Sequence, residues 1–372
     1  MTRKILKGLL AFFSLLLICA LAFVVYMETR EPEQTIQNPE TQPVQTQPAT
    51  TEATTVPPTT LPPEPESFLL TFAGDFTPGC MPGQFENPKA YVGTVGEDYE
   101  YPFAYMRDYF ENDDFTFINL EVVMGVGVGR QANKTFVFSA PEEYVQIMTS
   151  SSVEGVTLAN NHSEDFGTEG YNNTKRILEE NGIAYVEKKN TLLYTTESGL
   201  TIGIYADVFN FNQSEIQQGI AQLREDGAEL VICAFHWGPE GVYQPHEKQI
   251  RYGRIAIDAG ADLVVGHHPH VLMPIEEYNG KIIFYSLGNF SFGGNDHPKD
   301  YDSVLIQMEI LRDPDGTIRL GQMHKIPICI SSVSDRNNYQ PIPYEEGSEG
   351  YNRVMEKLNG TYNGPNVTPG YN

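Results

Sequence analysis

Short apolar runs alternate with segments of helical periodicity from residue 67 onward, and this alternation is the feature that most restricts the fold. Runs of aromatic and β-branched residues predict strands at 68–73, 115–123, 155–159, 201–206, 229–235, 261–265, 281–285, 303–311 and 317–328. Apolar residues spaced three and four apart predict helices at 142–150, 169–181, 214–226 and 246–259. Strands that alternate with helices in this way predict an α/β domain.

Five of the predicted strands run directly into residues that can bind a metal ion or lie beside one. In chain order these segments are Gly74-Asp75, Asn119-Leu120-Glu121, Asn160-Asn161-His162, His236-Trp237-Gly238 and Gly266-His267-His268-Pro269-His270. In an open α/β sheet the ligand-binding crevice lies outside the carboxyl ends of the strands. We therefore expect these segments to converge on one site.

Each of these segments, taken singly, also has an ordinary structural explanation. A Gly-Asp pair after a strand is a common turn, and a single His after a strand is more often a hydrogen-bonded core residue than a ligand. Taken jointly, their carboxylates, amide oxygens and imidazoles form the donor set of a hard or borderline divalent cation. The sequence therefore predicts a divalent metal centre, with Mn, Zn, Fe and Mg as the candidates.

The same segments also carry a family resemblance. In this order, with Pro239-Glu240 after Gly238 and with Ser286-Leu287-Gly288-Asn289-Phe290 further on, they resemble the CapA family of poly-γ-glutamate capsule biosynthesis proteins. That family is related to the calcineurin-like metallophosphoesterases. The resemblance covers about residues 67–330 and is most specific from His236 to Phe290. It implies a four-layer α/β/β/α sandwich of the metallophosphoesterase type, with the metal site on one sheet edge.

The resemblance implies a role for each residue of the segments. Two ions would share Glu121, and the first ion would also bind Asp75 and His270. The further ligands of the second ion would be Asn161, His236 and His268. His162 would be catalytic without binding metal, because it would protonate the leaving group or steady its developing charge. The structural alternative for His162 is a hydrogen bond to Asp165. Contacts with the substrate or with the ligands would come from Asn119, Asn160, Glu240, His267 and Asn289.

Two departures from the phosphoesterase pattern leave parts of the site open. Asp75-Phe76-Thr77 replaces the Asp-x-His motif of those enzymes, which removes one imidazole from the first ion, and Asn119-Leu120-Glu121 replaces their Gly-Asp-x-x-Asp. The first site is thereby weakened, so either one ion or an exchangeable second ion would fit. Either His267 or His268 could be the ligand. We expect His268, because residues two apart, such as His268 and His270, share one face of an extended segment.

The N-terminal residues predict attachment to a membrane. Residues 8–26 are almost entirely apolar and long enough to span a bilayer, and the basic residues within 1–7 place the N-terminus in the cytoplasm. Residues 27–66 are rich in Pro, Thr, Gln and Glu, which predicts a disordered stalk. The alternative is a cleaved signal peptide. We expect an uncleaved single-pass anchor in the cell membrane that holds an extracellular domain at 67–345, followed by a C-terminal helix and tail at 346–372.

The net charge of the chain limits the classes of function that it can have. A net charge of −25 with no basic patch excludes nucleic-acid binding, because such a protein repels phosphate backbones. Two classes of function stay open. The first is a metal-dependent hydrolase or transferase acting on an anionic envelope polymer, and the second is a non-catalytic, metal-containing subunit of a poly-γ-glutamate synthesis and export complex. The expected partners are the membrane, the polymer and the subunits of such a complex. An ordinary soluble phosphatase fits poorly with an anchor and a stalk.

Overall fold

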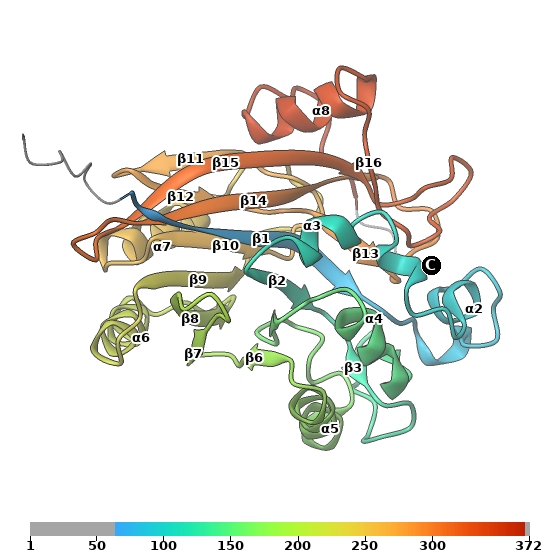
Figure 1. Cartoon of the computed structure of the whole chain (residues 1–372). Coiled ribbons are helices and arrows are strands. Elements are labelled where there is room, and N and C mark those ends of the chain that lie inside the picture. Colours follow the sequence, from blue (N-terminus) through green and yellow to red (C-terminus); the bar gives the residue numbers. More distant parts are fainter. Residues whose placement is uncertain (1–63, 369–372) are drawn as a thin grey trace, which may run out of the picture. The chain divides into compact units, whose positions relative to one another are not determined.

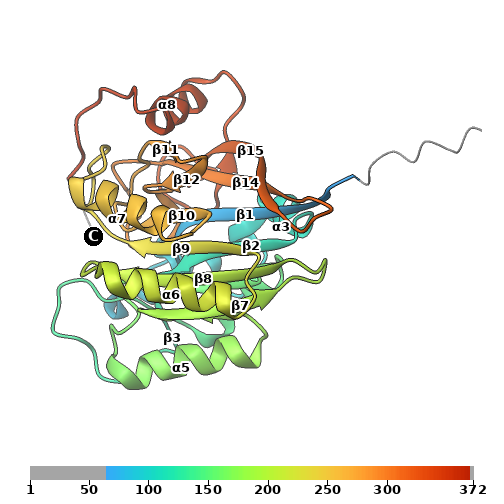
Figure 2. The same ribbon diagram turned by 90° about the vertical axis from the view of Figure 1, so that its left-hand side faces the viewer.

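Two β-sheets packed face to face form the centre of the domain, and helices cover their outer faces (Figure 1, Figure 2). The computed structural model describes residues 64–368. The predicted anchor at 8–26 and nearly all of the predicted stalk lie outside these residues. Within residues 64–368, no helix has the length and apolar character that crossing a membrane requires.

The first sheet has the strand order β16-β15-β14-β1-β2-β5-β6, and β13 pairs with the end of β1. Its parallel half runs from β1 through β2 and β5 to β6, and β14, β15 and β16 extend it in antiparallel pairing. The strands are β1 (Glu66–Thr77), β2 (Phe115–Leu120), β5 (Gly155–Thr157), β6 (Ala184–Val186), β13 (Asn289–Phe292), β14 (Asp302–Arg312), β15 (Ile318–Cys329) and β16 (Ile342–Pro343).

The second sheet has the strand order β11-β12-β10-β9-β8-β7. Its four central strands are parallel, and β7 and β11 are antiparallel edge strands. The strands are β7 (Asn190–Thr195), β8 (Thr201–Val208), β9 (Leu230–His236), β10 (Leu263–His267), β11 (Ile275–Tyr278) and β12 (Lys281–Phe284). A separate two-stranded pair consists of β3 (Val123–Met124) and β4 (Ser139–Ala140).

Helices flank both sheets (Figure 2). The second sheet is covered by α6 (Gln213–Glu225) and α7 (Glu247–Asp258). The first sheet is covered by α2 (Tyr91–Val95), α3 (Arg107–Glu111), α4 (Val145–Thr149) and α5 (Gly167–Glu180). The C-terminal helix α8 (Glu349–Leu358) lies over β14 and β15 (Figure 1). Single turns of 3₁₀ helix occur at Pro82–Gln84, Tyr101–Phe103 and Glu142–Tyr144.

Three hydrophobic clusters fill the spaces between neighbouring layers. One lies between the two sheets, where alternate residues of β1, such as Leu70 and Phe72, belong to the same cluster as Ile204 and Ile232 of the second sheet. Another joins the first sheet to α3, α4 and α5, and a third joins the second sheet to α6 and α7. The predicted α/β class is confirmed, and the clusters give the order helices, sheet, sheet, helices.

The end of β1 is shaped by a bulge and by a close contact. The pairing of β1 with β2 shifts register between Phe72 and Asp75. A Cβ atom at Gly74 would lie 2.0 Å from the carbonyl oxygen of Gly288, so only glycine allows this approach. The backbone N–H of Asp75 donates to the same oxygen at 2.9 Å. A side chain at position 74 would therefore displace Asp75 from the sheet edge.

The predicted elements differ from the observed ones for physical reasons. The run at 115–123 is two strands, because β2 ends at Leu120 before the chain turns into β3. The run at 142–150 begins as a 3₁₀ turn and continues as α4. The sequence does not predict β6 or β7, since three residues show no periodicity and β7 is a largely exposed edge strand. The helix expected within 346–372 is α8.

Two largely buried acids at the opposite edge of the first sheet make stability depend on pH. Asp113 and Glu154 precede β2 and β5 and line a cavity of about 420 Å³. Burial raises the pKa of each carboxyl to about 7. The folded state therefore keeps protons that the unfolded state releases above about pH 4. Because the folded state binds more protons in this window, stability falls as the pH rises from about 4 to about 7.

We expect Asp113→Asn and Glu154→Gln each to raise the midpoint of thermal unfolding at pH 8 by on the order of 5 °C, and to change it little at pH 4. Each amide keeps an oxygen for the hydrogen bond that the carboxylate accepts from Thr116. Glu143→Gln, at an exposed position away from this cavity, is the matched control. Equal gains at both pH values, or a loss at pH 8, would contradict the prediction.

Candidate metal centre

The parallel strands bring the predicted segments to one edge of the two sheets. In the first sheet, strand pairing aligns Asp75 with Asn119 on one side and with Asn289 on the other. In the second sheet it aligns His236 with His267. The two edges meet, because Nδ1 of His267 lies 3.3 Å from Oδ1 of Asp75. Polar side chains from both sheets therefore share one crevice at the carboxyl ends of the strands.

Among residues 64–368, three overlapping groups of side chains have their ligand atoms within 4.8 Å of one another. The groups are Glu121 with His236 and His268, Asp75 with Glu121 and His270, and Glu240 with His268 and His270. Glu121 is common to the first two groups, as a carboxylate that bridges two ions must be. Asn161 adjoins the first group, because its Oδ1 lies 2.6 Å from Nε2 of His236. The structure thus brings all six predicted ligands together.

Glu121 is completely buried, and neither of its oxygens accepts a hydrogen bond from any residue between 64 and 368. Burial and the neighbouring Asp75 both raise the pKa of this carboxyl well above its usual range. A buried carboxylate without hydrogen-bond donors is costly unless another charge compensates it. The surrounding carboxylates and imidazoles are donors that divalent ions such as Mn, Fe and Zn accept. The residues present therefore fit a divalent cation bound at Glu121.

The protonation of His236, His268 and Asp75 fits the same ion. Burial and His268 lower the pKa of His236 well below its usual value, and burial and His270 lower that of His268 to about 3. Both imidazoles are therefore neutral at pH 7, which is the form that binds metal. Burial opposes the charge of Asp75, but hydrogen bonds from His267 and His270 hold its pKa well below the usual range. Burial also opposes the charge of His270, but Glu121 and Asp75 raise its pKa to about 9. His270 is therefore protonated at pH 7 without metal, and it would have to release that proton to bind the ion.

The structure separates the two adjacent histidines at the end of β10. His267 is the last residue of that strand, contacts Asp75 and belongs to none of the three groups, whereas His268 belongs to two of them. This supports His268 as the ligand. The reason is not the one expected from the sequence, because the segment is not extended: φ is +94° at His268 and +56° at His270. Residues other than glycine rarely adopt this left-handed backbone conformation, and residues strained in this way are concentrated at functional sites.

Asn119 and Asn160 hold other residues of the centre in place. Nδ2 of Asn119 donates to Oδ1 of Asp75 at 2.8 Å, and Nδ2 of Asn160 donates to Oδ1 of Asn119 at 3.0 Å. Oδ1 of Asn160 accepts from the backbone N–H groups of His162 and Ser163, each at 2.9 Å. This chain of hydrogen bonds links β1, β2 and the loop after β5. It fixes Asp75 relative to the backbone of His162.

Asn289 and Glu240 lie beside the two left-handed histidines. Oδ1 of Asn289 is 2.9 Å from Nδ1 of His270, so Asn289 orients that ring. Oε1 of Glu240 is 4.0 Å from Nε2 of His268. Of the carboxylates in the three groups, Glu240 alone is partly exposed. It can therefore reach an incoming ligand without the movement of a buried residue.

His162 lies at the edge of the centre and belongs to none of the three groups. Its Nδ1 is 2.8 Å from Oδ2 of Asp165, and its Nε2 is 4.0 Å from Oε1 of Glu121. The carboxylate of Asp165 only accepts hydrogen bonds, so the ring hydrogen resides on Nδ1 and Nε2 is directed to the centre. Burial lowers the pKa of His162, and Asp165 opposes this shift. The hydrogen bond named as the structural alternative is thus present, and it orients the ring.

Lys134 is a residue of the centre that the sequence does not indicate. It pairs with Asp165, and its Nζ donates to the backbone oxygen of Asn161 at 2.7 Å and lies 3.3 Å from Nδ1 of His162. It comes from the loop between β3 and β4, which has several glycines and no periodic pattern. The contacts of a single lysine in such a loop cannot be predicted from the sequence. Its contacts arise only when the loop packs against the segment after β5.

The sequence matches the family model of the bacterial capsule synthesis protein PGA_cap over residues 69–294. It is 30% identical over 308 residues to the capsule biosynthesis protein CapA of Bacillus anthracis, with 74% of this chain and 72% of that protein covered. It is 31% identical over 279 residues to the PGA biosynthesis protein CapA of Bacillus subtilis strain 168, with 69% of this chain and 70% of that protein covered.

Among solved structures, the NAD nucleotidase of Haemophilus influenzae is similar over 80% of this chain and 63% of that chain, with a TM-score of 0.40 and 12% identity. A likeness this distant carries no argument about the site. The family match, in contrast, spans every candidate ligand from Asp75 to His270. The chain therefore belongs to the PGA_cap family of bacterial capsule synthesis proteins.

Proposed function

We propose that this protein is a membrane-anchored, extracellular CapA-like protein whose divalent metal centre hydrolyses or transfers a bond of an anionic envelope polymer during capsule synthesis or export. The observation that carries the proposal is the geometry around Glu121. This buried carboxylate is shared by two groups of ligand atoms, and Nε2 of His162 faces it from 4.0 Å without belonging to either group. A structural ion needs only its ligands. The imidazole of His162, which faces the shared carboxylate without being a ligand, therefore supports catalysis.

Each side chain has a task in the proposed reaction. A divalent cation, when held by Asp75, Glu121 and the imidazoles, supplies a Lewis acid and a water of lowered pKa. Nε2 of His162 carries no proton in the resting protein, so it would take one from the attacking water and pass it to the leaving group, and Asp165 would stabilise the imidazolium formed between the two transfers. Asn119 keeps Asp75 in a fixed position, so the reacting groups need no rearrangement.

We propose an anionic polymer, poly-γ-glutamate, as the substrate. Two relatives have names that refer to capsule or PGA biosynthesis, which supports this class. The chain itself has a net charge of −25, so it attracts a polyanion only where positive charge is concentrated. A bound divalent ion is the largest local charge of such a site. The metal centre is therefore the place where the polymer would bind.

We also propose that residues 8–26 anchor the protein in the cell membrane as a single pass, with residues 27–66 as a stalk outside the cell. Basic residues before the apolar run support this orientation. Protease added to intact cells is then expected to cut the stalk and release a folded body that begins near residue 67. A mature N-terminus near Phe23 would instead identify a cleaved signal peptide.

Turnover of two substrates tests the proposed reaction. Metal-loaded protein is incubated with a γ-linked glutamate oligomer and with a generic phosphodiester, and the products are separated by chromatography. Hydrolysis of either substrate that is lost in His162→Ala supports a hydrolase. A wild-type protein that binds metal but converts neither substrate contradicts catalysis. That result would favour a non-catalytic, metal-containing subunit of a polymer synthesis and export complex.

A further inference from the structure

Phe209 is held in a strained position against the metal centre. Its φ is +54°, and the N–H of Asn210 donates to the carbonyl oxygen of Val208 at 2.7 Å, which closes a tight turn around it. The ring packs edge-on against the rings of His268 and His236, with centroid separations of 4.8 and 5.7 Å. Nevertheless 44% of Phe209 is exposed. A strained turn that presents an exposed aromatic ring is typical of a binding site rather than of a core.

A groove of about 300 Å³ begins at this ring, and we call it the Phe209 groove. Its apolar wall comes from residues that follow β8 and β9, and its rim comes from the start of α7. The wall includes Phe209, Phe211, Trp237 and Pro239, and the rim includes His246 and Lys248. Because Phe209 also contacts the rings of two candidate metal ligands, the groove lies next to the metal centre.

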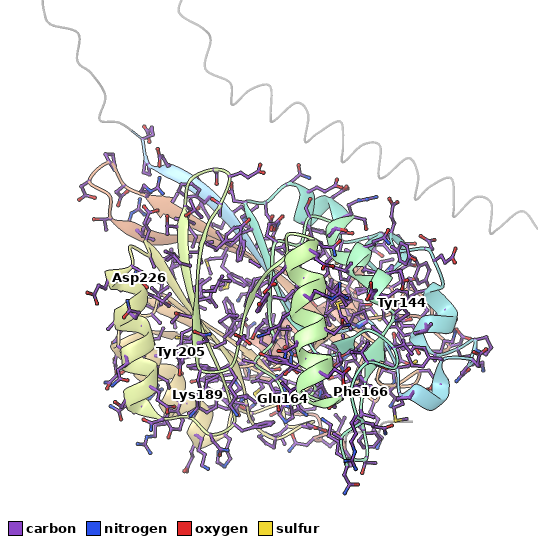
Figure 3. The ribbon with its side chains drawn as sticks, turned by 90° about the horizontal axis from the view of Figure 1, so that it is seen from below. Tyr144, Glu164, Phe166, Lys189, Tyr205 and Asp226 are labelled. Atoms are coloured by element: carbon purple, nitrogen blue, oxygen red, sulfur yellow. The ribbon has the colours of Figure 1, made fainter. Side chains whose placement is uncertain are left out.

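Phe209 borders a second cavity as well, of about 210 Å³, which includes Asn161, Glu164 and Lys188. Seen from below, Glu164 and Lys189, the neighbour of Lys188, lie along the same edge of the molecule (Figure 3). Asn161 connects this cavity to the metal centre through its contact with His236. Phe209 thus lies between two cavities beside the metal centre. This arrangement fits a linear chain that extends past the centre on both sides better than it fits a small terminal group.

The charge along the Phe209 groove is opposite to that of the chain. Lys248, which carries an ammonium group, lines the groove, and among the described residues no Asp or Glu does so. The whole chain has 49 acidic residues against 24 Lys and Arg. An anion is therefore repelled by most of the surface and attracted to this groove. Because the apolar wall lies next to Lys248, the groove favours a ligand in which an apolar part adjoins a negative charge.

We propose that the Phe209 groove binds the polymer unit next to the bond held at the metal centre. The fitting unit combines a short methylene stem with a carboxylate, as γ-linked glutamate does. The stem packs on Phe209 and Phe211, which removes apolar surface from water, and the carboxylate pairs with Lys248. This inference rests on the proposed function and names the residues that determine its substrate specificity.

The fluorescence of Trp237 tests this subsite, because Trp237 lines the groove and is the single Trp of the chain. The full-length, metal-loaded protein in detergent is titrated with a γ-linked glutamate oligomer, and wild type is expected to show a saturable change. Phe209→Ala and Lys248→Glu, with unchanged metal content, are each expected to raise Kd about tenfold. Tyr105→Ala and Lys89→Glu change exposed residues that line neither cavity, so these matched controls are expected to bind as wild type does.

An unchanged Kd in both groove variants would overturn the subsite. If wild type and both variants still hydrolyse the oligomer with the same KM, the proposed function stands and only the groove assignment fails. If wild type binds metal but neither binds nor hydrolyses the oligomer, both proposals fail. A rise in Kd in the groove variants and not in the two controls supports the subsite even where no turnover is detected.

Discussion

Replacing His162 with Ala is expected to lower turnover by about 10²–10⁴-fold and to leave the bound metal in place. His162 belongs to none of the ligand groups, yet its Nε2 lies 4.0 Å from the carboxylate of Glu121. The loss of a proton donor slows bond cleavage, whereas the loss of a non-ligand leaves the metal donors intact. Turnover is measured at saturating substrate, and the metal content of the same sample is measured by mass spectrometry.

Asn161→Ala is the matched comparison, because Asn161 is the adjacent residue and its Oδ1 lies 2.6 Å from Nε2 of His236. Removal of this amide oxygen is expected to lower both metal content and turnover. Metal loss in His162→Ala together with full occupancy in Asn161→Ala would reverse the two roles. If His162 only anchors its loop through Asp165, His162→Ala costs about 1 kcal/mol of stability and leaves turnover nearly intact.

Removal of the metal is expected to lower the midpoint of thermal unfolding by about 4 °C. A ligand that binds only the folded state stabilises it by about 2.7 kcal/mol at 100 times its Kd, and a domain of about 300 residues shifts by about 1.5 °C per kcal/mol. Chelation also removes the charge of the ion from beside the buried carboxylate of Glu121. The midpoint is recorded by calorimetry with and without EDTA.

Glu121→Gln supplies the control for the chelator. A variant that has lost the shared carboxylate binds the ion less tightly, so its midpoint is expected to respond much less to EDTA. A wild-type midpoint that is the same with and without EDTA would contradict the prediction. An equal response of wild type and Glu121→Gln would show that EDTA acts elsewhere in the protein.

The fold and the place of the site follow from local patterns in the sequence. The apolar runs before Asp75, Glu121 and His236 are long enough to form strands by themselves. Parallel strands deliver whatever follows them to one edge of a sheet. For this reason the gathering of polar side chains at one edge of each sheet could be predicted, whereas the meeting of the two edges depends on how the sheets pack.

Features that depend on packing between distant segments could not be predicted in this way. Lys134 reaches Asp165 from a loop without periodicity, so only the docking of that loop determines the contact. Phe209, His268 and His270 adopt a left-handed backbone that local propensity disfavours. Propensity describes the unstrained chain, whereas tertiary contacts hold functional residues in strained conformations.

The most direct test of the metal centre is the metal content of the purified protein after dialysis, measured for wild type and for His236→Ala. We expect at least one divalent ion per wild-type chain and a large loss in His236→Ala, because that imidazole is a buried donor beside Glu121. A folded wild-type protein that contains no divalent metal, and takes up none of added Mn, Zn, Fe or Mg, would contradict the claim that these residues form a metal centre.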